Sequence, residues 1–400
     1  MTGALSAVRV LDFSQGHGGP YCTMQLGDNG AEIIKIEPSE GDWARGLGPP
    51  FVGGESAYFL ALNRNKKSIA LNLKNPRGLQ IALDLARRCD VVVENFRPGV
   101  ADRLGIGYDT IEKMNPRVVY CSISALGSEG PDKDLPGTEL TLQARGGVIL
   151  TLGVPGEAPV RFGEEGASVA TGNYAAQAIV AALFHRVRSG EGQHVKTSML
   201  RALTHLANRA FVVDTEVDQP QRRSEEPNTG FRTKDLDISF TFSTMLAGYP
   251  AEERWREFCN RVGLGHIVND PRFTTNRDRT QNTEALKRYY EAAFKDKSSA
   301  ELVVILEELG AVYAVSNDYP TLFSHPQILE NEMLMEFEHP TVGNVKTVGF
   351  AVKMLETPSQ IRMPPPLLGQ HTAEILKSLG YATADIKGLE SQGIVKQWRG

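Results

Sequence analysis

The feature that most constrains the fold is a regular alternation of short apolar segments and helical patterns in the first half of the chain. Apolar segments of strand type occur at residues 8–14, 32–37, 68–73, 91–96 and 117–124. Runs of consecutive apolar residues are typical of strands that are buried on both faces, and strand–helix–strand order favours a parallel sheet. The sequence therefore predicts an α/β domain of the Rossmann-like kind.

The stretch GEEGASVATGNYAAQAIVAAL, from Gly163 to Leu183, predicts an acidic loop that leads through small residues into a long helix. Its apolar residues recur at helical spacing as far as Val187. Basic residues in the last turn suit the negative end of the helix dipole, and Gly190 supplies the stop. A junction of this kind can hold one reactive side chain against a substrate, and the residue at the turn is Ser168.

The composition argues against several classes of protein. The net charge of −5 over 400 residues disfavours a nucleic-acid surface, which is usually basic. The 4 cysteines have no CxxC spacing, so we expect neither a zinc site nor a disulfide framework, and a reducing, cytoplasmic location fits. The sequence has no signal-peptide pattern at its start and no run of ~18 apolar residues, so we expect no contact with a membrane.

Basic residues collect around two of the predicted strands. NRNKKSIALNLKNPRG (63–78) contains five of them, and ENFRPGVADRLG (94–105) adds Arg97 and Arg103. Ligands of parallel sheets collect outside the carboxyl ends of the strands, where basic groups suit phosphates. The nearby loop at residues 16–20 fails as a dinucleotide loop, because Tyr21 replaces the required glycine. The pattern alone indicates either an anion-binding edge or an ordinary solvated surface.

Seven stretches, taken in order along the chain, resemble the family III CoA-transferases, the group that contains formyl-CoA and carnitine CoA-transferases and α-methylacyl-CoA racemase. They are VRVLDFS before a glycine–proline loop, GAEIIKIEP with the GD that follows, NRNKKSIALNLKNPRG, VVVENFRPGVADRLGIGYD, NPRVVYCSISALG, AALFHRVRSGEGQHVKTSM and PLLGQHTAEILKSLGY. The resemblance covers most of the chain and is weak only between residues 205 and 330.

The resemblance implies a large Rossmann-like domain with a parallel sheet, built from residues 1–210 and 330–400, and a smaller α+β domain at residues 225–329. The polar segment 211–228 is then a linker. Two subunits of this family interlock like links of a chain. The resemblance therefore implies an interlocked dimer, either a homodimer or a heterodimer or heterotetramer with a related subunit.

The resemblance also implies that the basic edge binds coenzyme A, presented as an acyl-CoA thioester, without a metal. The positions that match the family's CoA contacts are Gly16 and His17 at the pantetheine arm, Leu71, Lys74, Asn95 and Phe96 beside the nucleotide, and Arg103 and Leu104 beside its phosphates. Pro38 and Pro136 stand where formyl-CoA transferase has cationic residues, so we expect those two contacts to be absent.

Ser168 is the main departure from the family pattern. Counting back from Gly172 places it where family members have an aspartate, the nucleophile that accepts the acyl group and then holds CoA as a thioester. Such a thioester needs a carbonyl carbon, and a serine hydroxyl has none. Serine could carry the acyl group as an ester only with an activating base beside it, and no histidine is near in sequence.

Three hypotheses for the function follow. In the first, this chain is the subunit without the aspartate in a heteromeric CoA-transferase, similar to benzylsuccinate CoA-transferase, and a related partner supplies the aspartate. In the second, Glu164 or Glu165 takes over as the carboxylate, or the chain isomerises or cleaves a CoA thioester. Racemisation is disfavoured because Thr138 replaces the racemase's proton-transferring histidine. In the third, the chain is a CoA-binding scaffold without catalysis.

Formyl-CoA and oxalate are disfavoured as substrates, because residues 228–243 are not glycine-rich, unlike the lid loop of formyl-CoA transferase.

Overall fold

The computed structural model describes residues 3–152, 158–163, 165–208, 230–242 and 251–399, and the chain divides into two compact units. The first unit comprises Met1–Val148, Arg161–Val212 and Leu329–Gly400, and the second comprises Ile149–Val160 and Val213–Ile328. The candidate site residues fall within the ranges of the first unit. Glu164 and the predicted linker at 211–228 lie outside the described residues.

The first unit is built on a seven-stranded sheet with the strand order β13-β5-β2-β1-β6-β7-β8. The strands are β1 (Arg9–Asp12), β2 (Glu32–Glu37), β5 (Lys66–Leu71), β6 (Val91–Glu94), β7 (Val119–Ser124), β8 (Gln193–Ser198) and β13 (Val395–Lys396). Neighbouring strands pair in parallel, except that β13 joins β5 antiparallel. Without β13, the strands lie in the order third, second, first, fourth, fifth, sixth, which is the order of a Rossmann fold. The predicted Rossmann-like parallel sheet is confirmed.

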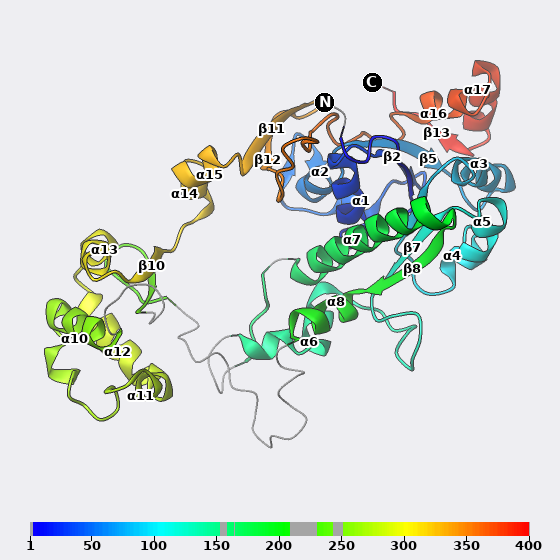
Figure 1. Cartoon of the computed structure of the whole chain (residues 1–400). Helices are drawn as coiled ribbons and strands as arrows, with labels where there is room; N and C mark the ends of the chain where they lie inside the picture. The colour runs from blue at the N-terminus through cyan, green and yellow to red at the C-terminus, as the bar shows by residue number, and fades with distance from the viewer. Residues whose placement is uncertain (1–2, 153–157, 164, 209–229, 243–250, 400) are drawn as a thin grey trace. The chain divides into compact units, whose positions relative to one another are not determined.

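Helices cover both faces of this sheet (Figure 1). They are α1 (Gly18–Asp28) and α7 (Gly166–Ser189) on one face, and α3 (Pro76–Ala86), α5 (Tyr108–Met114), α16 (Thr372–Ser378) and α17 (Thr383–Ser391) on the other. Val91 and Val93 of β6 pack with the first group, and Val92 packs with the second. Because successive side chains of a strand point to opposite faces, one continuous apolar run serves both cores.

The two helices that border the candidate site differ in part from the sequence prediction. α1 begins at Gly18, two residues before the predicted start at Pro20, and His17 is its N-cap residue. α7 has 24 residues and already begins at Gly166, so Ser168, which the sequence placed at the turn before the helix, is the third residue of the helix. By length and composition α7 could cross a membrane, but half of its apolar window is buried inside the structure, as expected of a helix that packs on a sheet.

Shorter elements complete the first unit, and the last residues of η2 belong to the second. They are η1 (Trp43–Gly46), β3 (Phe51–Val52), β4 (Glu55–Ser56), α2 (Ala57–Leu62), α4 (Val100–Arg103), α6 (Glu139–Arg145), η2 (Val148–Thr151), α8 (Met199–Leu206), β11 (Leu334–His339) and β12 (Gly343–Val348). α2 and α6 carry side chains that enter the candidate site described below.

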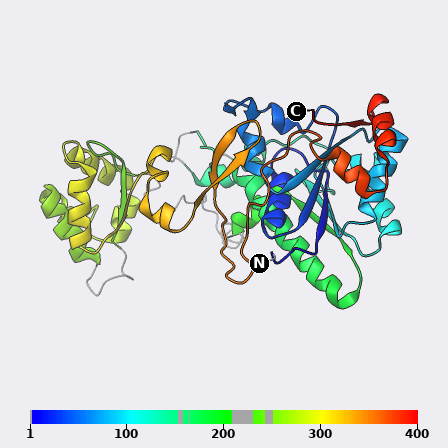
Figure 2. The same cartoon turned by 90° about the horizontal axis from the view of Figure 1, so that it is seen from above.

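The second unit has a core of its own, rich in aromatic side chains. Its elements are β9 (Ile238–Thr241), α10 (Ala251–Val262), η3 (Gly265–Ile267), α11 (Asn276–Gln281), α12 (Thr283–Phe294), α13 (Ser299–Glu308), β10 (Val312–Val315), α14 (Tyr319–Leu322) and α15 (Pro326–Glu330). Helices α10, α12 and α13 lie on one side of the antiparallel ribbon β9–β10 (Figures 1 and 2). A buried hydrogen bond of 2.7 Å from Trp255 Nε1 to the Tyr290 hydroxyl links α10 to α12.

Candidate active site

The first part of the site lies where the strand order of the sheet reverses, between β1 and β6. The loops that follow these two strands are joined by two hydrogen bonds: the Gln15 amide donates to Asn95 Oδ1 at 2.9 Å, and Asn95 Nδ2 donates to the Gln15 carbonyl at 2.7 Å. Ligands of open α/β sheets bind in the crevice at this point. The structure therefore brings Gly16 and His17 close to Asn95, as a shared ligand crevice requires.

The remaining predicted CoA contacts also follow strands at the carboxyl edge of the sheet. Lys74 follows β5 and is exposed, and Arg103, at the end of α4 beyond β6, is exposed as well. Leu71 differs from expectation, because its side chain is only 1% exposed and belongs to the hydrophobic core. Phe96 and Leu104 are half-buried against the same core. Leu71 can therefore face a ligand with its backbone alone.

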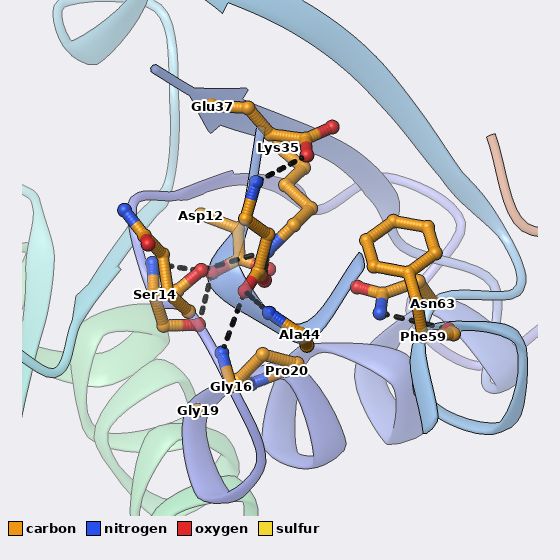
Figure 3. Close-up of polar contacts among 12 residues, drawn as sticks. Asp12, Ser14, Gly16, Gly19, Pro20, Lys35, Glu37, Ala44, Phe59 and Asn63 are labelled. Carbon is orange, nitrogen blue, oxygen red and sulfur yellow. Dashed lines mark hydrogen bonds and ion pairs between the residues drawn. The ribbon is translucent and has the colours of Figure 1, made fainter. Parts of the chain in front are cut away.

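A network of buried charges lies beneath the loop that contains Gly16 (Figure 3). Asp42 Oδ1 accepts the Gly16 amide at 2.9 Å, and Asp42 Oδ2 pairs with Lys35 Nζ at 2.8 Å. Lys35 Nζ also donates to the Ser14 carbonyl at 2.7 Å. Asp12 Oδ1 accepts the Ser14 amide at 2.9 Å. The backbone of the loop is therefore fixed by charge-assisted hydrogen bonds, which are stronger than neutral ones.

Lys66 extends this network to the first turn of α1. Its ammonium donates to the Pro20 carbonyl at 2.9 Å and pairs with Asp12 Oδ2 at 3.2 Å. Burial lowers the pKa of Lys66 to about 8, although Asp12 acts in the opposite direction. Burial alone would raise the pKa of Asp12, but Lys66 and Lys35 hold it below its usual value. Asp12 is therefore ionised at neutral pH and available to accept these hydrogen bonds.

His17 presents a neutral imidazole at the start of α1. Its ring lies edge-on to Tyr58, with 5.9 Å between the ring centroids, and parallel to Tyr21 at 6.4 Å. Burial lowers the pKa of His17 to about 4, despite the opposing effect of the Glu139 carboxylate. Its Nδ1 atom is buried and has no hydrogen-bond partner among the described residues. At neutral pH this ring can therefore accept or donate one hydrogen bond to a ligand without carrying charge.

The N-terminus of α7 closes the site from the other side. Gly172 of α7 packs against α1 so closely that a Cβ atom there would lie 2.7 Å from the Gly18 carbonyl oxygen. A Cβ on Gly18 would in turn lie 3.3 Å from the carbonyl oxygen of Ser168. Glycine at these positions lets the first turn of α7 approach the His17 loop.

Ser168 is bound to Glu139, a residue that the sequence did not single out. The Ser168 hydroxyl donates to Glu139 Oε2 at 2.8 Å, and its amide donates to the same oxygen at 3.0 Å. Glu139 Oε1 accepts the Ala167 amide at 2.6 Å and Gln143 Nε2 at 2.8 Å. Glu139 therefore caps α7 from α6, where a carboxylate also complements the helix dipole. A cap formed across 29 positions of sequence leaves no local pattern that would reveal it.

Glu165, the predicted alternative carboxylate, lies beside this cap. The Tyr58 hydroxyl donates to Glu165 Oε1 at 2.5 Å, Arg161 pairs with it at 3.3 Å, and the Glu139 carboxyl also hydrogen-bonds to it. Burial raises the pKa of Glu165, with Glu139 adding to the rise and with Tyr58 and Arg161 opposing it. Its side chain is 19% exposed, whereas Ser168 is only 5% exposed. Tyr58 was missed from sequence because it lies 107 positions from Glu165.

This arrangement disfavours an acyl-serine and favours carboxylate chemistry. The Ser168 hydroxyl already donates its hydrogen bond to Glu139, and no histidine nitrogen contacts it among the described residues. The other polar groups beside the N-terminus of α7 are a carboxyl with a raised pKa, a tyrosine hydroxyl and a neutral imidazole. A carboxylate in such a partly desolvated place can act as a nucleophile or a base.

Comparisons with known proteins bear on the class of the whole chain and not on individual residues of the site. A model described as CoA-transferase family III matches residues 5–372. The succinyl-CoA:glutarate CoA-transferase of Mus musculus is 37% identical over 401 residues, which cover 98% of this chain and 90% of the mouse protein. The formyl-CoA:oxalate CoA-transferase of Afipia carboxidovorans is 30% identical, with 98% of each chain covered.

Among solved structures, a CAIB/BAIF family protein from Brucella suis has the same fold. Its TM-score is 0.84 at 28% sequence identity, and the alignment covers 95% of this chain and 100% of that chain. The similarity therefore extends over both compact units and is not restricted to the sheet.

Proposed function

This chain belongs to CoA-transferase family III, and on that premise we propose that its substrates are short dicarboxylic acids and their CoA thioesters. It is a CoA-transferase, acting on an acyl-CoA and a carboxylic acid. The full-length similarity to succinyl-CoA:glutarate CoA-transferase, at 37% identity, supports four- and five-carbon diacids. Formyl-CoA:oxalate relatives match at lower identity.

Coenzyme A would occupy the crevice at the strand-order reversal. Gly16, His17 and Asn95 meet there, and the exposed Lys74 and Arg103 at the same edge of the sheet supply positive charge for its phosphates. The observation that carries this proposal is the position of the α7 N-terminus directly beside the His17 loop, which would place a thioester carbonyl against the helix end.

The transfer reaction needs a carbonyl-bearing side chain, and Ser168 has none. One candidate arrangement is a heteromer, in which a related subunit supplies the aspartate and this chain contributes CoA contacts. The serine at position 168, in a chain that keeps the residues matching the family's CoA contacts, supports it. The other arrangement is a homodimer that uses a carboxylate of this chain. The contacts of Glu165 with Tyr58 and Glu139 support the second arrangement.

The test is an assay of the purified chain with succinyl-CoA and glutarate. We expect glutaryl-CoA to form, as measured by liquid chromatography with mass detection, and acetate to be a poor acceptor in a parallel assay. Native mass spectrometry of the protein from its own host determines whether a related subunit copurifies. The proposed substrates would be wrong if neither the chain alone nor its native assembly forms glutaryl-CoA.

A further inference from the structure

We propose that Glu165 is the side chain that carries coenzyme A in this protein, in place of the residue at position 168. The proposal rests on the CoA transfer proposed above and identifies the carbonyl that the transfer requires.

Glu165 can reach the space that a side chain at position 168 would occupy. It is the N-cap residue of α7, and Ser168 is the third residue of the helix. The Glu139 carboxylate links the two positions, because it hydrogen-bonds both to the Glu165 carboxyl and to the Ser168 hydroxyl. A glutamate also has one methylene more than an aspartate. The added reach offsets its place one turn earlier.

The Glu165 carboxylate does not cap its own helix, because another carboxylate performs the capping. N-cap side chains ordinarily bind the first amides of their own helix. Glu165 makes no such bond, and Glu139 accepts the amides of Ala167 and Ser168 instead. Glu139 accepts four hydrogen bonds from Gln143, Ala167 and Ser168, which makes it a poorer nucleophile. Glu165 is thereby left to point at Tyr58.

The neighbours of Glu165 suit a carboxylate that must both attack and be attacked. Burial and the adjacent Glu139 make the ionised form more basic than a solvated glutamate, which increases its nucleophilicity. Tyr58 and Arg161 donate to the same oxygen and would stabilise the negative charge that develops when the Glu165 carbonyl is attacked. Because both of these donors bind Oε1, Oε2 is the oxygen that would attack the substrate.

The first half-reaction balances without any further reagent. A Glu165 oxygen attacks the carbonyl carbon of succinyl-CoA, the carbon–sulfur bond breaks, and CoA leaves as the thiolate. The product is a mixed anhydride of succinate and Glu165. The thiolate then attacks the Glu165 carbonyl carbon, the bond from that carbon to the bridging oxygen breaks, and succinate leaves with that oxygen. Glu165 now holds CoA as a thioester.

The second half-reaction regenerates the Glu165 carboxylate with one oxygen atom that came from glutarate. A glutarate oxygen attacks the Glu165 carbonyl carbon and expels the thiolate, which forms a second mixed anhydride. The thiolate attacks the glutaryl carbon, the bond from that carbon to the bridging oxygen breaks, and glutaryl-CoA leaves. The bridging oxygen came from glutarate and stays on Glu165. Each turnover therefore transfers one acceptor oxygen to the carrier side chain.

This oxygen transfer gives a test on the unmodified protein. The purified chain is turned over with succinyl-CoA and glutarate labelled with heavy oxygen, quenched and digested with trypsin. Glu139 falls in the peptide 134–145, whereas Glu164, Glu165 and Ser168 fall in the peptide 162–186. We expect the label in the second peptide, with fragment ions placing it on Glu165. Label on Glu139 or Glu164, or turnover without label, would overturn the proposal.

A pair of variants adds a kinetic test. Glu165→Gln keeps the shape of the side chain but removes the nucleophile, so we expect turnover to fall by about a thousandfold or more with an unchanged melting temperature. Glu307→Gln is the matched control, because Glu307 also accepts a tyrosine hydroxyl, that of Tyr313, in the second unit. We expect its turnover to be unchanged. Full activity of folded Glu165→Gln would refute the assignment.

The labelling and the assay distinguish a failure of the Glu165 assignment from a failure of the proposed CoA transfer. Glutaryl-CoA formation with an unlabelled Glu165 refutes the carrier assignment and leaves the proposed transfer intact. Formation that requires a related subunit refutes the assignment in favour of a carboxylate from that partner. If glutaryl-CoA forms in neither preparation, both the carrier assignment and the proposed substrates fail.

Discussion

Lys66 and Lys67 are neighbours in β5 whose ammonium groups face different surroundings. Lys66 is fully buried and pairs with Asp12, whereas Lys67 pairs with Glu32 and Glu374 and is 24% exposed. Lys66→Met would leave Asp12 buried with less positive charge beside it, so we expect the free energy of unfolding to fall by about 3–5 kcal/mol. For Lys67→Met we expect a loss below about 1 kcal/mol. Denaturant unfolding of both variants checks this, and equal losses would contradict the role assigned to the buried network.

The pH dependence of transfer follows from the raised pKa of Glu165. The groups that face it are Tyr58 from α2, Glu139 from α6 and Arg161 from the preceding loop, with His17 behind Tyr58. Attack requires the ionised carboxylate, so activity is lost as the pH falls through a pKa above that of a solvated glutamate. The Tyr58 hydrogen bond lowers this pKa, so Tyr58→Phe should move the acid limb of kcat/KM to higher pH.

Tyr313→Phe provides the control for this profile, because Tyr313 makes the same kind of bond to Glu307 in the second unit. We expect its acid limb to coincide with that of the unmodified protein. A Tyr58→Phe profile that also coincides would show that Glu165 is not the group that titrates.

At the scale of single elements, the strands of the first half could be predicted from sequence because burial on both faces of the sheet leaves a continuous apolar run in each strand. Residues 32–37 were predicted and found as β2, while β6 ends at Glu94 and frees Asn95 to bind Gln15. Sequence could not reveal β13, because two residues carry no periodicity. Nor could it reveal Glu139, because its role is a contact between α6 and α7.

The contact between α1 and α7 depends on a helical glycine. Gly172→Ala would place a Cβ atom 2.7 Å from the Gly18 carbonyl oxygen, so the two helices must separate, and we expect a loss of about 1–3 kcal/mol in the free energy of unfolding. Gly388 in α17 is the matched control, because a Cβ there meets no atom within 4 Å. Gly388→Ala should stabilise by about 0.5–1 kcal/mol through helix propensity alone.

Thermal and denaturant unfolding of the two variants measures this contrast, and the assay of CoA transfer adds a functional readout. Only Gly172→Ala should lower turnover, because it moves the N-terminus of α7 relative to His17. Stabilisation by both alanines would show that the close approach is not needed.

At the scale of the whole molecule, the return of the C-terminal segment to the first unit was expected from the resemblance and not from periodicity. Residues 349–363 lack regular structure and carry no pattern, yet side chains of the first half bind their backbone. Asn65 Oδ1 accepts the amides of Arg362 at 2.6 Å and Met363 at 3.1 Å. Asn65 itself has a left-handed backbone with φ of 63°, which asparagine tolerates better than most residues. Contacts across some 300 positions can be read only from the folded chain.

Asn65 therefore offers a test of how residues 360–363 are held against the first half of the chain. Its Nδ2 donates to Asp28 Oδ1 and to the Gln360 carbonyl, each at 2.8 Å, in a fully buried place. Asn65→Asp keeps the shape but replaces the donor by an oxygen that faces both acceptors. We expect a loss of about 3–5 kcal/mol in the free energy of unfolding at neutral pH and faster proteolysis between residues 349 and 363. Asn344→Asp makes the same change at an exposed contact with Glu336, where an effect within about 0.5 kcal/mol is expected. Equal unfolding midpoints for the two variants would mean that the C-terminal segment is held by its apolar contacts and not by this asparagine.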